Sequence, residues 1–527
     1  MKRSFWGWGS SEFLLDPSYI ENYLPLLRSS FGVQDEDPMP VPDLEKIHLS
    51  EPAILIPPDL AIFCTSSNED RLGHTYGKSF RDVWRALHGQ WDAAPDYVAY
   101  PKNEDHLTRL FEYAGKHDVA LIPFGGGSSV CGGVERPRNE KYAAAISVDM
   151  KHFNQVLEID RASRSALIQA GCFGPQIESQ LKPHGYTLRH YPQSFEFSTL
   201  GGWIATRSGG HYATLFTHID EFVQNVRMIT PTGIIDTKKL PGHGAGPSEE
   251  RFYCGSEGIL GIITQAWMRI QDIPKFKTSS VVNFDSFGTG VKACRRLAQS
   301  GLHPSNARLV DAVEALSNRL GDGQHAVLIL GFESHENDVD EKMSEALRLM
   351  EEMGGKTEKP VENSKHKKSD KADNWKNAFF KAPYLRDELI RYGFVIETFE
   401  TSITWERFDQ FHKEIIRTTQ EAIEKYCGVG FVTTRFTHLY SDGPAPYYTA
   451  IAKGRKGHQL DQWDGIKEAV SSRIVELGGA ITHHHAVGKD HLPYYEKQRT
   501  PLFGEVLKSA KKTLDPNGIL NPGTLLR

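Results

Sequence analysis

Three consecutive histidines, His483, His484 and His485, stand near the end of the chain in the stretch ITHHHAVG, between two glycine turns. An imidazole changes its charge near neutral pH, so it can serve as an acid, a base or a metal ligand. A metal site, a proton-transfer site and a solvated loop without a role are all open. In an extended segment, His483 and His485 would share one face and His484 the other. Three consecutive ligands to one metal are geometrically awkward, which counts against zinc.

A glycine-rich loop, PFGGGSSV, is a second candidate site and follows the apolar run VALI. Three glycines permit close backbone approach, and successive free N–H groups can form a nest for an anion such as a diphosphate. The loop matches neither the GxGxxG dinucleotide pattern nor a P-loop. Small-residue segments at 194–203, 206–210 and 255–264 also open into apolar runs. Together, the four segments can surround an extended ligand with phosphates at one end and a flat ring at the other.

Length and composition limit the kind of protein that can position these residues. The chain has 527 residues, of which 39% are hydrophobic and 24% charged, and its net charge is −6. This length predicts two or more domains, and the charge does not indicate a nucleic-acid-binding protein. No apolar run of about 18 residues and no signal-peptide pattern occurs, so we expect no transmembrane helix and no export. Six scattered cysteines without a CxxC pair favour a reduced, cytoplasmic protein.

The alternation of short apolar runs and amphipathic stretches predicts an α+β fold. Residues 1–90 are interpreted as an N-terminal extension with short helices, and residues 91–275 as a domain dominated by short strands. Helical patterns such as RFDQFHKEIIRTTQEAIEKY alternate with strand-like runs over 276–475, which predicts a second α+β domain. Residues 476–527 form a C-terminal segment. Residues 356–376 have almost no apolar side chains and predict a mobile loop, either a solvated insertion or a lid over the active site.

The glycine loop and the segments SFEFSTLGGWIATRSGG and GSEGILGIIT, in this order, resemble the FAD-binding PCMH-type domain of the vanillyl-alcohol oxidase / p-cresol methylhydroxylase superfamily. The resemblance implies FAD, a two-subdomain FAD-binding domain, an α+β cap domain for the substrate and a C-terminal segment that returns to the flavin site. Non-covalent FAD is expected, because Ser128 and Ser129 stand where covalent members often carry a histidine. The residues implied to bind FAD are Pro123, Phe124, Gly125, Gly126, Gly127, Ser128, Ser129, Gln193, Ser194, Phe195, Glu196, Phe197, Ser198, Thr199, Thr206, Arg207, Ser208, Gly209, Glu257, Gly258, Ile259, Leu260, Gly261, Ile262 and Ile263.

Further motifs are similar to those of the alkyldihydroxyacetonephosphate synthase family. They are WGWG near the start, NARLVD at 306–311, FETS at 399–402 and THHHAVGK at 482–489. This resemblance implies that the acyl group of acyl-dihydroxyacetone phosphate is exchanged for a long-chain fatty alcohol, forming an ether lipid without net redox change. It implies that Arg435 binds the substrate phosphate, and that Tyr447 transfers a proton, with Tyr448 as the alternative register. The implied catalytic residues are Tyr447, His483, His484, His485 and Arg308.

The chain departs from the family pattern in a few places. Ala486 follows the histidine triplet where the family has glycine, and Gln193 stands where aspartate is usual. No peroxisomal signal is seen, which again favours a cytoplasmic enzyme. Two fatty chains require an apolar tunnel and imply peripheral membrane contact, and we expect a homodimer. The alternative functions are an FAD-dependent oxidase or dehydrogenase of a 2-hydroxy acid or alcohol, and a flavin- or lipid-binding protein without activity.

Overall fold

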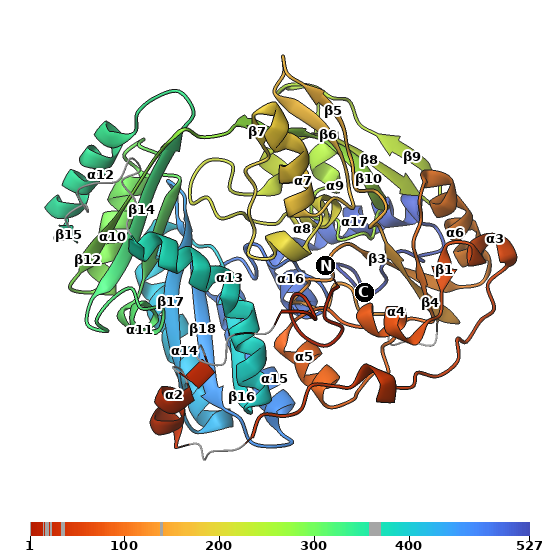
Figure 1. The fold of residues 1–527 in the computed structure, drawn as a ribbon, viewed down its shortest axis with the longest axis horizontal. Helices are drawn as coiled ribbons and strands as arrows, with labels where there is room; N and C mark the ends of the chain where they lie inside the picture. Colours follow the sequence, from red (N-terminus) through yellow and green to blue (C-terminus); the bar gives the residue numbers. More distant parts are fainter. Residues whose placement is uncertain are drawn as a thin grey trace.

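In the computed structural model the chain forms two lobes that lie side by side (Figure 1). Each lobe is built around its own sheets, and the two chain termini lie close together in the first lobe. The structure describes residues 2–13, 15, 20–21, 24–32, 37–137, 141–357 and 370–527, with the backbone alone for 370–379.

The first lobe contains two main sheets. A four-stranded sheet has the order β1-β2-β4-β3, with β2, β4 and β3 parallel. A five-stranded antiparallel sheet has the order β5-β6-β10-β8-β9, and β7 and β11 form a short ribbon. The strands are β1 (Cys64–Thr65), β2 (Tyr97–Ala99), β3 (Val119–Phe124), β4 (Ala144–Asp149), β5 (Val156–Asp160), β6 (Ser165–Gln169), β7 (Tyr186–Thr187), β8 (Val223–Thr230), β9 (Gly233–Asp236), β10 (Ile262–Arg269) and β11 (Gln271–Asp272).

Helices cover the sheets of the first lobe, and α6 shows why they form. Asn103 caps its N-terminus by accepting from the backbone N–H of His106, and its buried side chains recur at helical spacing from Leu107 to Ala114. The helices of this lobe are α3 (Pro58–Ala61), α4 (Asn68–Gly73), α5 (Phe80–Leu87), α6 (Glu104–Lys116), α7 (Gly174–Leu181), α8 (Leu200–Thr206), α9 (Glu249–Tyr253), α16 (Leu492–Gln498) and α17 (Pro501–Leu514).

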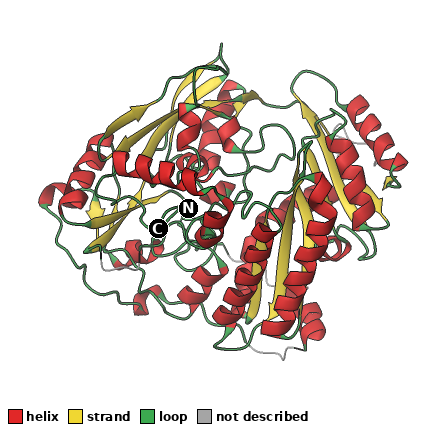
Figure 2. Ribbon diagram, turned by 180° about the vertical axis from the view of Figure 1, so that it is seen from behind, coloured by secondary structure: helices red, strands yellow, loops and turns green. Residues whose placement is uncertain are grey.

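The second lobe is a single seven-stranded sheet with the order β15-β12-β14-β13-β17-β18-β16, in which all neighbouring strands are antiparallel. Long helices line the sheet (Figure 2). The strands are β12 (Phe276–Phe284), β13 (Asn306–Val310), β14 (Ala326–Ser334), β15 (Lys356–Thr357), β16 (Phe394–Glu400), β17 (Gly430–Leu439) and β18 (Pro444–Lys453). The helices are α2 (Leu24–Phe31), α10 (Phe287–Ala298), α11 (Ala312–Ser317), α12 (Asp340–Glu352), α13 (Asp370–Arg391), α14 (Trp405–Cys427) and α15 (Gln459–Glu476).

One face of the seven-stranded sheet forms the largest hydrophobic core. Leu309, Phe399, Phe436 and Tyr448 belong to this core together with side chains of α10, α12, α14 and α15. Because side chains alternate along a strand, the neighbours of these core residues point to the opposite face. That opposite face carries polar side chains of the predicted site.

The structure confirms an α+β fold and corrects one local prediction. Residues 370–376, which we predict as part of a mobile loop, form the start of the 22-residue helix α13. Residues 358–369, the rest of that predicted loop or lid, lie outside the described residues. No helix in the described part of the chain combines the length and the apolar character needed to cross a bilayer.

Both ends of the chain are attached to the predicted FAD loops. Arg3 donates to the Gly125 carbonyl at 2.9 Å, and its guanidinium pairs with Asp149 at 2.7 Å. At the other end, the Leu121 N–H of β3 donates to the Ile519 carbonyl, and the Asn521 N–H donates back to Leu121. The terminal segments therefore brace the strand that leads into the glycine loop.

Candidate active site

The four small-residue segments predicted from the sequence meet in space. A side chain at Gly126 would lie 1.7 Å from the Phe197 carbonyl oxygen, and one at Gly125 would lie 2.3 Å from the Thr199 hydroxyl. Gly258, in the segment 255–264, has φ +76°, and a side chain there would meet Pro123 at 2.7 Å. Glycine is required at these positions because a side chain would collide with the neighbouring segment, and Gly258 also needs the left-handed conformation.

The glycine loop offers the donors that a diphosphate needs. Within the described residues, no backbone N–H from Gly126 to Val130 donates to a protein acceptor. Consecutive unpaired N–H groups form an anion-binding nest, since buried backbone donors otherwise find partners. A small pocket beside the loop is lined by Arg3 and Lys78, which supply positive charge. Burial lowers the pKa of Lys78 to about 8. These features fit the diphosphate of FAD.

Several predicted FAD residues turn their side chains elsewhere. Arg207 pairs with Asp220 at 3.2 Å and more than half of its side chain is exposed. The side chains of Ile259, Leu260 and Ile262 lie inside hydrophobic cores. Any contact of these three residues with a cofactor would therefore come from their backbone atoms. The predicted roles of the individual FAD residues stay predictions.

Two buried carboxylates from different lobes hold the histidine segment. The Glu400 carboxylate, at the end of β16, accepts from the backbone N–H groups of His483, His484 and His485 and from the Thr482 hydroxyl. Each Glu257 oxygen accepts at 2.8 Å from a backbone N–H just after the triplet, at residues 487 and 488. Burial raises the pKa of each carboxyl to about 7, against the opposing effect of the donors.

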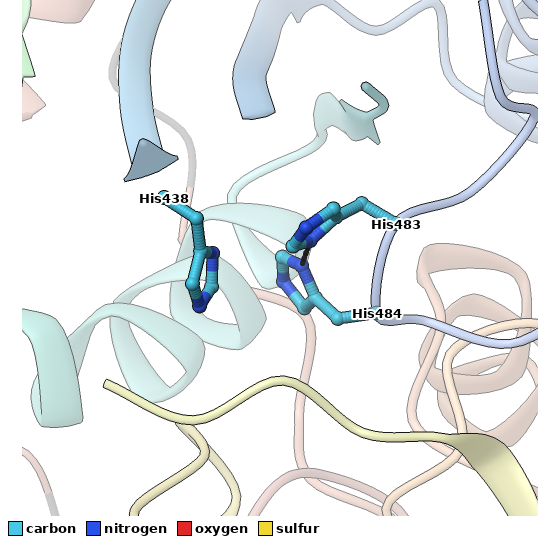
Figure 3. Close-up of side chains that lie close together, drawn as sticks. All are labelled: His438, His483 and His484. Carbon is cyan, nitrogen blue, oxygen red and sulfur yellow. Dashed lines mark hydrogen bonds between the residues drawn. The ribbon is translucent and has the colours of Figure 1, made fainter. Parts of the chain in front are cut away.

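The triplet is not extended, so the predicted alternation of faces is wrong. Three successive N–H groups converge on one carboxylate, which curls the backbone around Glu400. As a result, His483 and His484 turn toward each other, with their Nδ1 atoms 3.0 Å apart (Figure 3). His485 faces Tyr447 edge-on, with ring centres 5.8 Å apart. His485 is also connected to the loop after the glycines, because the Cys131 thiol donates to its carbonyl.

A fourth histidine joins the triplet from the seven-stranded sheet. Ring nitrogens of His438, His483 and His484 lie within 4.8 Å of one another, a grouping that could hold a metal ion (Figure 3). The objection to three consecutive ligands does not apply to this set, because His438 comes from β17. However, both ring nitrogens of His438 have partners, the Gly210 carbonyl and the Thr437 hydroxyl. Both ring nitrogens of His438 are thus already engaged in hydrogen bonds.

Alternation along the strands brings the other predicted residues to the same face. Glu400 pairs in register with Tyr447, and Tyr447 pairs with Arg435 on the next strand. The Tyr447 ring stacks near His484, with ring centres 6.1 Å apart. Tyr448 points the other way into the core, where its hydroxyl meets His412. Only Tyr447 of the two tyrosines thus faces the triplet.

The two predicted arginines lie on this face, where Arg308 is buried and Arg435 is partly buried. Arg435 donates to Glu314 at 2.6 Å and lies over the Tyr447 ring at 3.9 Å. Burial raises the pKa of the Tyr447 hydroxyl, and the Arg435 charge opposes this shift. Arg308 donates to the His211 carbonyl at 3.1 Å, in the loop that follows Gly209. Arg308 therefore connects the sheet with a predicted FAD segment.

Sequence reasoning missed four groups at this site: Glu400, His218, His438 and Tyr440. Glu400 was visible only as part of the FETS motif, whereas Glu257 was predicted, but as an FAD-binding residue. His218 and Tyr440 had no signal at all, yet each has an atom within 3.0 Å of His483. A register shift in β17 between Phe436 and His438 helps to explain the omission of His438, because it breaks simple alternation.

Comparisons with known proteins agree with this arrangement. Residues 95–238 match the family model of the FAD binding domain, and residues 273–525 match that of FAD linked oxidases, C-terminal domain. A solved structure of p-cresol methylhydroxylase with substrate bound superposes with a TM-score of 0.67 at 13% identity, over 97% of both chains, which shows a shared fold. The two family models and the shared fold define an FAD-dependent enzyme with the fold of p-cresol methylhydroxylase.

More similar relatives narrow this class. Alkyldihydroxyacetonephosphate synthase from Dictyostelium discoideum is 30% identical over 93% of this chain and 84% of its own, and that from Trypanosoma brucei brucei is 29% identical over 86% and 77%. A solved alkyldihydroxyacetonephosphate synthase structure has a TM-score of 0.83 at 26% identity, covering 99% of this chain and 98% of its own. The chain belongs to the alkyldihydroxyacetonephosphate synthase family and is an FAD-dependent enzyme of this type, which confirms the predicted family and cofactor.

Proposed function

We propose that the enzyme exchanges the acyl group of an acyl-dihydroxyacetone phosphate for a long-chain alcohol, forming an ether bond. One observation carries the proposal: the histidine triplet lies between the glycine loop and the Tyr447 face of the second sheet, held by a carboxylate from each lobe. Acid–base groups and the FAD loops therefore meet at one junction. The similarity to the synthases along the whole chain supports the same reaction.

Proton transfer is the chemistry that these side chains perform. Tyr447 removes a proton from the carbon that bears the acyl group and returns it after the exchange. Bound FAD supplies an electrophilic centre for that carbon. Overall, the alcohol O–H bond breaks, as does the bond between that carbon and the acyloxy oxygen. An ether C–O bond forms at the same carbon, and the alcohol proton ends on the released carboxylate. Electrons balance without an external oxidant, which matches a reaction without net redox change.

Arg435 is proposed to bind the substrate phosphate. A guanidinium suits a phosphate dianion because its planar array of donors can pair with two oxygens at once. Glu314 already pairs with Arg435 and fixes its orientation beneath the Tyr447 ring. The phosphate would thus be anchored one strand away from the proposed base, Tyr447.

The loop between Gly210 and Thr217 is a candidate for lipid contact. The Gly210 N–H donates to the Thr217 carbonyl at 2.8 Å, so both ends of the loop lie beside the histidine cluster. At its tip, Leu215 is 54% exposed and Phe216 is 38% exposed. We propose that these two side chains contact a membrane surface, and that the fatty substrates enter the active site from that surface. The six free cysteines support a reducing, cytoplasmic location.

A product assay tests the proposed function directly. The purified holoenzyme is incubated with palmitoyl-dihydroxyacetone phosphate and hexadecanol, and the products are measured by mass spectrometry. We expect hexadecyl-dihydroxyacetone phosphate and palmitate in equal amounts. Absence of ether product, with reduction of the flavin by D-lactate or another 2-hydroxy acid, would show a dehydrogenase instead.

A further inference from the structure

A chain of hydrogen-bonded rings runs through the histidine cluster. The Tyr440 hydroxyl lies 2.8 Å from His483 Nε2, and His483 Nδ1 lies 3.0 Å from His484 Nδ1. At the Tyr440 end, the tyrosine hydroxyl also lies 3.2 Å from the Thr217 hydroxyl and 3.4 Å from His218 Nδ1. At the opposite end of the chain of rings, the His484 side chain is 19% exposed, and its Nε2 has no partner within the described part of the protein.

We propose that this chain is a proton relay, in which His484 Nε2 takes the proton of the incoming alcohol and Tyr440 is a positioning residue that lets His483 hold the resulting charge. The inference rests on the proposed function and deepens it by assigning the two ends of the relay. Neither Tyr440 nor the Tyr440–His483 pair follows from the sequence motif.

The hydrogen-bond geometry allows this assignment because the relay can hold its protons in two ways. In the first, His484 Nδ1–H donates to His483 Nδ1, His483 Nε2–H donates to the Tyr440 oxygen, and the Tyr440 hydroxyl donates to Thr217 or His218. His484 Nε2 then carries a lone pair and can act as a base. In the second, every proton is shifted, so Tyr440 donates to His483, His483 donates to His484, and His484 Nε2 carries the proton. All bonds within the chain are satisfied in both arrangements.

The proton balance of one turnover follows from the first arrangement. The alcohol O–H bond breaks and an N–H bond forms at His484 Nε2, which makes His484 cationic. His484 then passes its Nδ1 proton to His483 Nδ1, so the positive charge moves away from the alcohol. His483 remains hydrogen-bonded to the Tyr440 oxygen through Nε2–H. When the Nε2 proton of His484 passes to the carboxylate product, the Nδ1 proton returns and the relay is restored.

The surroundings keep the resting relay neutral, as a base requires. Burial lowers the pKa of His484 to about 3 and that of His483 well below its usual value. The charges of Arg435 and Arg308 lower the pKa of His484 in the same direction. Glu400 is committed to the backbone N–H groups of the triplet. When the alcohol proton arrives, the positive charge is shared between the His483 and His484 rings, which lowers the free energy of protonation.

The test compares two tyrosine variants in the holoenzyme. Tyr440→Phe removes the hydroxyl that contacts His483. Tyr76→Phe is the matched control, because the Tyr76 hydroxyl also makes a hydrogen bond, at 2.8 Å to the Gln90 carbonyl, outside the site. Steady-state exchange with hexadecanol is measured in mixtures of H2O and D2O. For Tyr440→Phe we expect kcat to fall about 10- to 100-fold, KM for hexadecanol to stay within about twofold, and the curved proton inventory to become linear. Tyr76→Phe should behave like wild type.

The outcomes separate the relay from the proposed function. A wild-type enzyme that forms no ether product refutes the function, and the relay with it. An active wild type, with an unchanged kcat and an unchanged proton inventory in Tyr440→Phe, refutes the relay alone. A bound metal at one equivalent that is lost in His438→Ala would also overturn the relay. A second measurement does not depend on activity: 15N-histidine NMR of the wild type should show neutral imidazoles, with a proton shared between the Nδ1 atoms of His483 and His484. Imidazoles without this shared proton would contradict the relay.

Discussion

Substitution of Gly126 tests whether the glycine loop is the FAD site. An alanine Cβ at this position would lie 1.7 Å from the Phe197 carbonyl oxygen and 2.7 Å from the Ser198 Cα, whereas real Cβ contacts essentially never fall below 3.0 Å. One of the two segments must therefore move by at least 1.3 Å, the difference between 3.0 and 1.7 Å. Overpacking of this kind costs about 1–3 kcal/mol. If the strain falls on the FAD-bound state, the affinity for FAD drops roughly 5- to 150-fold.

The assay is a titration of the apoprotein with FAD, followed by quenching of flavin fluorescence, with circular dichroism as a check of the fold. Gly288→Ala is the matched control, because a Cβ at Gly288, in α10 of the second lobe, finds its nearest neighbour at 3.9 Å. An FAD affinity within twofold of wild type in a folded Gly126→Ala protein would refute the contact between the glycine loop and Phe197, or the assignment of this loop to FAD.

Three further predictions concern the site. Tyr447→Phe should retain FAD but lower kcat for ether formation at least about 100-fold, since it removes the proposed proton-transfer group; retained turnover in the product assay would exclude Tyr447 from that role. Ala486 has φ +70°, so Ala486→Gly should raise the free energy of unfolding by about 1 kcal/mol, measured by urea denaturation, and a loss of stability would contradict the strained backbone. Burial raises the folded-state pKa of Glu400 from 4.5 to about 7. Its stabilising contribution is therefore fully present below pH 4.5 and is lost as the pH rises to about 7. The free energy of unfolding of Glu400→Gln, relative to that of wild type, should thus rise by roughly 3 kcal/mol between pH 4.5 and 7.5. This figure comes from 2.5 pKa units at 1.36 kcal/mol each. A difference between the two proteins that does not change with pH would show that Glu400 is already ionised in the folded protein at low pH.

Much of the fold was readable from local sequence patterns. The 20-residue helical pattern from 407 to 426 lies inside α14, because a buried stripe at helical spacing needs only local residues to be recognised. The charged stretch 356–376 misled the prediction, since the start of α13 lies at its end and continues into apolar residues beyond it. Low apolar content marks the absence of a buried face, and it does not exclude a helix.

The sequence by itself determined the cofactor loops and the residue types of the site. Glycine nests and the histidine triplet are contiguous, so their chemistry is visible in a few letters. Only the tertiary structure decided how the triplet is used. Glu400 reaches His483 from 83 residues away, and Glu257 reaches Val487, just after the triplet, from 230 residues away. Tyr440 reaches His483 from the residue after β17. The Glu400 carboxylate accepts hydrogen bonds from three consecutive backbone N–H groups, and this sets the direction of each imidazole. Glu400 is far away in the sequence, so no local pattern predicts that direction.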